Sequence, residues 1–402
     1  MSIALNKEPK LRMADAKLIL KAIVLQNLDL RSQGVPMSSL NVPYLLGEPG
    51  IGKTSIVDQV TKEVGIGFEP LILAQYDLGD LGGLPYLAPL VKSEKIPKEE
   101  RVEGGPKKRY IETDEKQYRR ARPFFMPTEG RGILFLDEVT QAFMANQNIA
   151  AQLVNEGRIG EHILPKGWIV VLASNEATNR AGTNPMPSHL KDRLNWLPCG
   201  AYYKDVVELF HKKKLDERLP AYLRWRPDFL SKFNPDEDVC PSPRSWEKVA
   251  SHLSNPYFIS EEHRRRAIVG AVGEAAAADF HAFLGVWEKM PNPDDVIKDP
   301  RTAAIPKEED IKYALCAALS ARANETNAGS IVIYAERLLA ESSGEYGIYL
   351  VRDAIDRSGG LKSKLATRSR PIKSFLRNHG TSMYEMYADL PDTEDDDDVA
   401  VA

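Results

Sequence analysis

The stretch "YLLGEPGIGKTSIVDQV", Tyr44 to Val60, contains three glycines and one lysine between an apolar run and a helix-like run. Tyr44 to Leu46 form a short apolar run that predicts a buried strand, and Thr54 to Val60 have the apolar spacing of an amphipathic helix. The glycines therefore lie at a strand-to-helix turn, which predicts an α/β fold at this end of the chain.

The turn matches the pattern G-x-x-x-x-G-K-[ST], in which backbone N–H groups above a helix N-terminus bind phosphate oxygens. Glycine suits such a loop because it adopts positive φ and lets phosphates approach the backbone. Lys53 would reach the β- and γ-phosphates, and the Thr54 hydroxyl would ligate Mg²⁺. A glycine-rich turn without a ligand is the alternative, which the flanking strand and helix disfavour. The predicted nucleotide-binding residues are Gly47, Glu48, Pro49, Gly50, Ile51, Gly52, Lys53, Thr54 and Ser55.

The composition is that of an ordinary globular protein, with 43% hydrophobic and 27% charged residues in 402. This length favours two or three domains. The net charge of −4 argues against a nucleic-acid surface over the whole chain but leaves local basic patches open. The three cysteines are far apart and predict neither a zinc site nor a disulfide framework. No signal peptide is evident, and charged residues interrupt the best membrane candidate, 267–286, which we expect to be a buried helix in a cytoplasmic protein.

Further strands and helices predict the rest of the first domain. We expect a helix at 11–33, strands at 71–76, 132–138 and 168–175, a helix at 141–155 and a hairpin at 157–167. Short apolar strands that alternate with helices indicate a parallel sheet covered on both faces, with ligands at the carboxyl ends of the strands.

The domain organisation follows from changes in composition. Residues 1–203 are expected to form the nucleotide-binding core, with a charged insertion at about 86–127 that projects from it. Helical patterns predict a lid at 204–289 and a further helical region at 290–385. The tail 386–402 carries six acidic residues between Asp392 and Asp398, and we expect it to be disordered.

Two predicted strands end in polar residues. Asp137 can hold Mg²⁺, and Glu138 can polarise the water that attacks the γ-phosphate. A helix-capping turn is the alternative for two adjacent acids, and the phosphate loop upstream disfavours it. Asn175 follows the next strand, where its amide can bind the γ-phosphate or the attacking water.

Two arginines are candidates for contact with the phosphates. Arg193 in "HLKDRL" can stabilise transferring phosphoryl charge, either in its own subunit or in a neighbouring one, although a salt bridge to Asp192 is an alternative. Arg244 in "PSPRSW" falls in the first turn of a predicted helix, where a cation opposes the helix dipole unless an anion lies nearby. An exposed arginine with no partner is the alternative there.

Taken in order, "GEPGIGKT", "ILFLDE", "VLASNEATN", "HLKDRL" and "PSPRSW" resemble an AAA+ ATPase, and most closely the MoxR-like branch with its phage relatives. The resemblance implies a P-loop αβα core with an all-α lid. It implies Walker A at 47–54, Walker B at Asp137 and Glu138, sensor 1 at Asn175, sensor 2 at Arg244 and an arginine finger at Arg193. It also implies a homo-oligomeric ring, usually a hexamer, that binds ATP and Mg²⁺ between subunits.

The leading hypothesis is an ATPase that remodels or matures a partner protein complex, with a separate von Willebrand factor A domain protein as a candidate partner. The second is a nucleic-acid motor or helicase loader in DNA replication, because 92–122 holds eleven basic against seven acidic residues with tyrosines between them. The segment 361–380 has six Lys or Arg and no acid. A solvated charged face is the simpler explanation of such segments, and the acidic tail can mask the second one. A nucleotide-gated scaffold with little hydrolysis is disfavoured by the two carboxylates.

Overall fold

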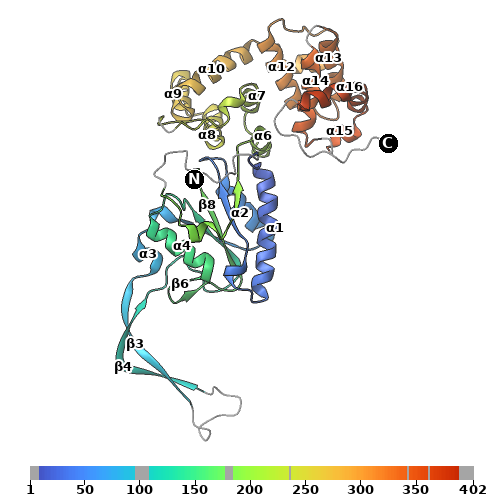
Figure 1. The fold of residues 1–402 in the computed structure, drawn as a ribbon. Helices are drawn as coiled ribbons and strands as arrows, with labels where there is room; N and C mark the ends of the chain where they lie inside the picture. The colour runs from blue at the N-terminus through green and yellow to red at the C-terminus, as the bar shows by residue number, and fades with distance from the viewer. Residues whose placement is uncertain are drawn as a thin grey trace. The chain divides into compact units, whose positions relative to one another are not determined.

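The computed structural model describes residues 9–95, 108–176, 184–234, 237–341, 344–360 and 363–388. The chain divides into two compact units, Met1–Gly200 and Ala201–Ala402 (Figure 1). The first unit is an αβα core around a parallel sheet, and the second is helical. The predicted fold class is therefore confirmed.

Among the described residues, the first unit contains a five-stranded sheet in the order β2-β5-β8-β1-β9, with every pairing parallel. The strands are β1 (Val42–Leu46), β2 (Gly67–Ile72), β5 (Gly132–Asp137), β8 (Trp168–Ser174) and β9 (Leu194–Pro198). Strands β5 and β8 are almost wholly buried, as expected for a parallel sheet covered on both faces.

Two details of the sheet differ from the prediction. The strand expected at 71–76 is placed earlier, at β2, because Leu73–Gln75 forms a 3-10 turn, η3. The edge strand β9 was not predicted at all, although it pairs with β1 along the whole length of both strands. Its short sequence "LNWLP" is buried at its first and fourth positions and partly exposed at the others, which is a weak pattern for a strand.

Helices cover both faces of the sheet (Figure 1). On one face α1 (Met13–Ser32) packs on α2 (Lys53–Val64) and β8, and on the other α4 (Met144–Glu156) packs on its smaller neighbours. The smaller elements are η2 (Met37–Ser39), η3, α3 (Leu78–Gly82) and α5 (Ser188–Lys191). The helices expected at 11–33 and 141–155 are therefore present.

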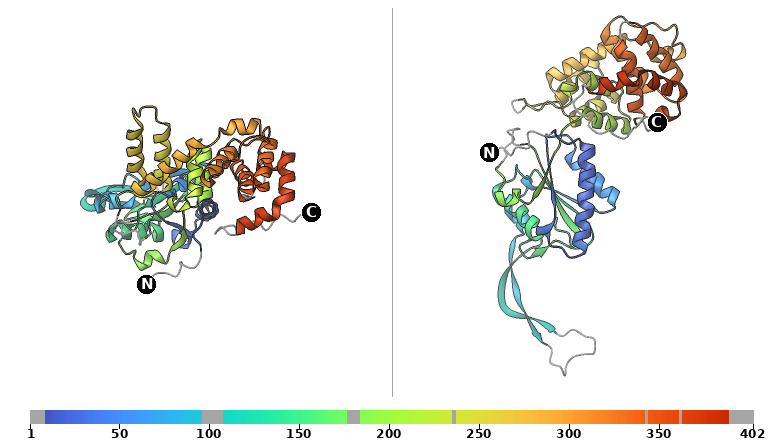
Figure 2. Two further views of the ribbon diagram at one scale, coloured as in Figure 1. Left: turned by 90° about the horizontal axis from the view of Figure 1, so that it is seen from above. Right: turned by 45° about the vertical axis from the view of Figure 1, so that its right-hand side comes forward.

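The charged insertion contains a long two-stranded antiparallel ribbon, β3 (Pro85–Lys95) and β4 (Lys108–Arg120), that projects from the sheet body (Figures 1 and 2). The predicted hairpin is also present as β6 (Arg158–Ile159) and β7 (His162–Ile163). The tip of this hairpin contacts the base of the ribbon, where the Glu161 carboxylate accepts a bond from the Arg120 backbone N–H at 3.3 Å. His162 Nε2 lies 2.9 Å from the Arg120 carbonyl oxygen.

The second unit is built from helices. These are α6 (Tyr203–Lys212), α7 (Arg218–Trp225), η6 (Pro227–Phe229), α8 (Pro243–Ser254), α9 (Glu261–Val272), α10 (Glu274–Lys289), α11 (Pro293–Lys298), α12 (Glu309–Arg322), α13 (Ala328–Ala340), α14 (Gly344–Arg357), α15 (Lys364–Arg368) and α16 (Arg370–Ala388). The single buried helix expected at 267–286 is wrong, because Gly273 at φ 83° separates α9 from α10. No helix among the described residues is long and apolar enough to cross a membrane.

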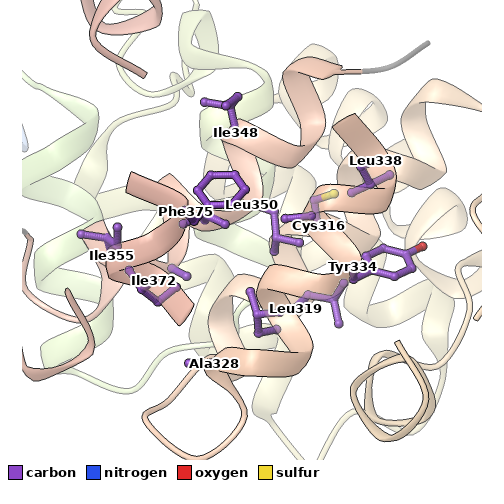
Figure 3. Packing of buried hydrophobic residues seen from close by; sticks show 14 of the residues in the cluster. Cys316, Leu319, Ala328, Tyr334, Leu338, Ile348, Leu350, Ile355, Ile372 and Phe375 are labelled. Atoms are coloured by element: carbon purple, nitrogen blue, oxygen red, sulfur yellow. The ribbon is translucent and has the colours of Figure 1, made fainter. Parts of the chain in front are cut away.

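Two hydrophobic cores lie in the second unit. One gathers around Tyr222, Trp246 and Phe280, and the other around Leu319, Tyr334 and Phe375 (Figure 3). The limits of the lid and of the C-terminal region remain predictions, and most of the acidic tail lies outside the described residues.

A buried charge cluster connects helices of both cores. The Asp353 carboxylate on α14 is 1% exposed and accepts bonds from Arg224 of α7 at 2.5 Å and from Arg357 at 2.7 Å. It also accepts a bond from the Ser320 hydroxyl of α12. Burial opposes ionisation of Asp353, but Arg357 and Arg224 outweigh it and hold the pKa of this carboxyl below its usual value.

Candidate functional site

The predicted phosphate loop joins β1 to α2 at the carboxyl edge of the sheet. Gly50 and Gly52 have φ of 80° and 106°, a region that disfavours residues with a Cβ. A Cβ on Gly47 would lie 2.5 Å from the Cys199 carbonyl oxygen and 2.6 Å from Ile51 Cδ1. Two of these glycines are thus required by conformation and the third by close packing.

Lys53 is 7% exposed, and its ammonium group forms hydrogen bonds with the backbone of the loop. Lys53 Nζ donates to the carbonyl oxygens of Gly47 at 2.8 Å and Glu48 at 2.9 Å. It also donates to Asn175 Oδ1 at 3.0 Å. An ammonium has three protons, so a phosphate oxygen that accepts from Lys53 would exchange with one of these oxygens. Lys53 therefore connects the phosphate loop to the residue that follows β8.

Asn175 meets Lys53 because Leu46 pairs with Ser174 in the sheet, which places the residues after β1 and β8 side by side. Ser174, which we did not single out from the sequence, fixes the neighbouring turn because its hydroxyl accepts the Thr140 backbone N–H at 3.1 Å. A lone serine at the end of an apolar strand gives no signal of this role.

The Thr54 hydroxyl donates to Asp137 Oδ2 at 2.7 Å, so the two residues predicted to ligate magnesium lie together. A hydroxyl and a carboxylate oxygen are both hard ligands, and Mg²⁺ at nucleotide sites takes few protein ligands beside water and phosphate. The pair therefore fits a magnesium ion. Among the described residues, no group of three or more His, Cys, Asp or Glu could hold a metal ion by itself.

Glu138 has φ of 55°, an unusual value for a residue with a side chain. Its backbone N–H donates to Asp137 Oδ1 at 2.9 Å, and the next N–H, of Val139, donates to the Ala173 carbonyl at 3.2 Å. The sheet thus holds Glu138 in a strained conformation, and strain of this kind is concentrated at functional sites.

Cys199 follows β9 and borders the loop through its backbone carbonyl. Burial raises the pKa of its thiol to about 12, although Lys53 lowers it and Glu176 adds to the increase. Such a thiol is protonated near neutral pH and is a poor nucleophile. We did not assign Cys199 from the sequence because β9 was not predicted, and its contribution is backbone oxygen and packing.

Arg193 lies apart from the phosphate loop of its own chain. It directly precedes Leu194, which pairs with Val42 at the start of β1, whereas the loop follows Leu46 at the end of β1. A five-residue strand separates these ends by about 15 Å. The exposed guanidinium donates to the Ser38 carbonyl at 3.2 Å, at the amino edge of the sheet.

Arg244 lies in the first turn of α8, as predicted. Ser242 caps this helix in a capping box with Ser245, and Pro243 occupies the first position. The Arg244 side chain is exposed and forms no hydrogen bond or ion pair with any other residue that the structure describes. It belongs to the second unit, so its role toward the phosphate loop stays a prediction. Arg180, which the sequence offers as a weaker candidate than Arg193 for contact with the phosphates, lies outside the described residues.

The chain is similar to a known protein over part of its length. The chain is 31% identical over 136 residues to the chaperone protein ClpB of Mycoplasma genitalium, which covers 34% of this chain. The match spans 16% of the ClpB chain, about a sixth of its length. No family model matches the sequence.

Solved structures of two mutants of Thermotoga maritima RuvB align with 93% and 92% of this chain, each at 13% identity. The alignments cover 96% and 94% of the RuvB chains, with TM-scores of 0.31 and 0.29. Scores this low do not establish a shared arrangement of the whole chain.

Proposed function

We propose that this protein is a MoxR-like AAA+ ATPase that forms a homo-oligomeric ring, a hexamer in the cytoplasm, and uses ATP hydrolysis to remodel a partner protein complex. The observation that carries the proposal is the junction of three sequence motifs at one sheet edge. Lys53 of the phosphate loop contacts Asn175, and Thr54 contacts Asp137 beside Glu138.

The proposed roles follow from these positions. Backbone N–H groups of the loop from Gly47 to Ser55 and the ammonium of Lys53 would bind the ATP phosphates. Glu138 would accept a proton from the attacking water, and Asn175 would orient that water or the γ-phosphate. Thr54 and Asp137 would hold Mg²⁺, which neutralises phosphate charge when bound.

Arg193 is proposed to act on the ATP of a neighbouring subunit. The support is its place at the amino edge of the sheet, about a strand length from its own loop. A mixture of Arg193→Ala and Lys53→Ala chains tests this role, since some interfaces would then combine an intact loop with an intact arginine. Recovery of ATPase activity above that of either mutant alone is expected. No recovery, with both mutants still assembled, would argue against action between subunits.

Arg244 is proposed as the second arginine of the site, from the lid. Its support is an exposed cation in the first turn of α8 with no partner among the described residues. Such a position is unfavourable beside the helix dipole, and a bound phosphate would remove the conflict.

The ribbon β3–β4 is proposed to contact the client. An isolated two-stranded ribbon is only marginally stable in water, so contact with another protein would stabilise this one. The ribbon exposes the side chains of Tyr110 and Tyr118. Apolar and aromatic surface of this kind is typical of protein contact sites. A separate protein with a von Willebrand factor A domain is a candidate client.

A nucleic-acid motor is the second candidate function. The observation in its favour is that Lys116 lies between Tyr110 and Tyr118 on the exposed strand β4, a combination that suits phosphate contact and base stacking. Salt-dependent binding of DNA by the whole protein would favour it.

The test is affinity capture with Glu138→Gln, which should bind ATP, hydrolyse it slowly and retain its client. The matched control is Lys53→Ala, which should bind little ATP and retain none. A protein partner that is captured only by Glu138→Gln and survives nuclease treatment would support the proposal. Recovery of DNA, or of proteins lost after nuclease, would instead support the motor.

A further inference from the structure

The helices α15 and α16 carry five exposed cationic side chains, which we call the basic face. Its members are Lys364, Arg368, Arg370, Lys373 and Arg377. The spacing of three and four residues places the last three on one side of α16. The opposite side of the same helix is anchored in the core by Ile372 and Phe375 (Figure 3).

None of these five side chains forms a hydrogen bond or an ion pair with another residue in the part of the chain that the structure describes. By contrast, two exposed lysines elsewhere have acidic partners. Lys62 lies 2.6 Å from Asp58, and Lys213 lies 2.6 Å from Glu247. Like charges at helical spacings of three and four repel each other, so the basic face is unfavourable until an anion neutralises it.

We propose that the acidic segment 392–398 of the same chain binds the basic face. The segment carries six carboxylates, which complement the five cations. The chain can reach Lys373, because α16 ends at Ala388, fifteen residues beyond Lys373, or about 22 Å along the helix. Seven extended residues from Ala388 to Asp395 span up to about 23 Å.

The tether makes this pairing effective although each exposed ion pair is weak. Attachment to the same helix keeps the carboxylates at a high local concentration around the basic face. Exposed pairs are screened by salt, so the segment binds at low ionic strength and releases as salt rises. While it is bound, it excludes other polyanions such as nucleic-acid phosphates. The inference does not depend on the proposed ATPase function.

Zero-length carbodiimide coupling of the whole protein at low salt, followed by proteolysis and mass spectrometry, tests the proposal. We expect amide links from Lys364 or Lys373 to acids of 392–398. The Lys213–Glu247 pair is an internal positive control. A mixture of isotope-labelled and unlabelled protein should give links within one isotope only.

The matched variant changes Arg368, Arg370 and Arg377 to Gln and leaves both reporter lysines in place. Loss of three exposed pairs should lower the yield of tail links roughly threefold or more. An unchanged yield of tail links in this variant would mean that the links form by random collision of the tail with the lysines, and it would overturn the proposal. It would also be overturned by the absence of tail links where the control pair couples, by links to other acids alone, or by links only between labelled and unlabelled chains.

Discussion

Replacement of Asp353 by Ala should strongly destabilise the second unit. The carboxylate is 1% exposed and neutralises Arg224 and Arg357, whose side chains are 18% and 5% exposed. Its removal leaves two largely buried guanidinium groups without their counter-charge, which typically costs about 3–5 kcal/mol. The matched control is Asp58→Ala, which breaks the exposed pair with Lys62 at the same i,i+4 spacing and should cost less than about 1 kcal/mol.

Hydrogen exchange followed by mass spectrometry is the assay, because it resolves the two units within the whole chain. A loss of about 3 kcal/mol should accelerate exchange about a hundredfold or more in peptides from α12 and α14, with no change in β5 and β8. An acceleration below about tenfold would refute the claim that the cluster stabilises the unit.

The effect of Asp353 should also depend on pH. Because the pKa of Asp353 is lowered in the folded protein, its stabilisation is present above the unfolded value of 3.8. It is lost as the pH falls through the lower folded pKa. The difference between wild type and the variant should therefore shrink only below about pH 4.

Three further outcomes are expected. Glu138→Gln should retain ATP binding, measured by calorimetry, and lose roughly a hundredfold or more in turnover, because a general base contributes that much; equal turnover would exclude the assigned role. Gly47→Ala should weaken ATP binding, because its Cβ would overlap the Cys199 carbonyl, whereas Gly270→Ala in α9 has open space and should leave it unchanged. Hydrogen bonds and charge from two lysines of α1 lower the pKa of Glu63 to about 2. The stabilisation from these ion pairs is therefore present above the usual pKa of 4.5 and should fade as the pH drops toward 2. An NMR titration of Glu63 with a midpoint near 4.5 would contradict the ion pairs.

The sequence was sufficient to predict the sheet edge that carries the candidate site. Gly47 and Asn175 each follow a short apolar strand and Asp137 ends one, and parallel strands bring their carboxyl ends together. The structure adds what spacing cannot show, namely which side chains touch. The contact between Lys53 and Asn175, 122 residues apart, depends on the register of β1 with β8.

Other elements could not be predicted because their local signals are weak or depend on tertiary contacts. Strand β9 has a weak pattern of its own and is specified by pairing with β1, so the Cys199 carbonyl over Gly47 was missed. The sequence predicts the ribbon β3–β4 only as a charged insertion, because few of its residues are buried and an apolar strand pattern is therefore missing. The break at Gly273 lies within a run of small apolar residues that also suits one continuous helix.

The most direct test of the central claim is the rate of phosphate release from ATP by purified wild-type protein with Mg²⁺, measured over a range of protein concentrations. The account predicts hydrolysis that is absent in Lys53→Ala. It also predicts a rate per chain that rises with concentration, because Arg193 of one chain would complete the site of another. A wild-type rate no higher than that of Lys53→Ala at every concentration would contradict the account.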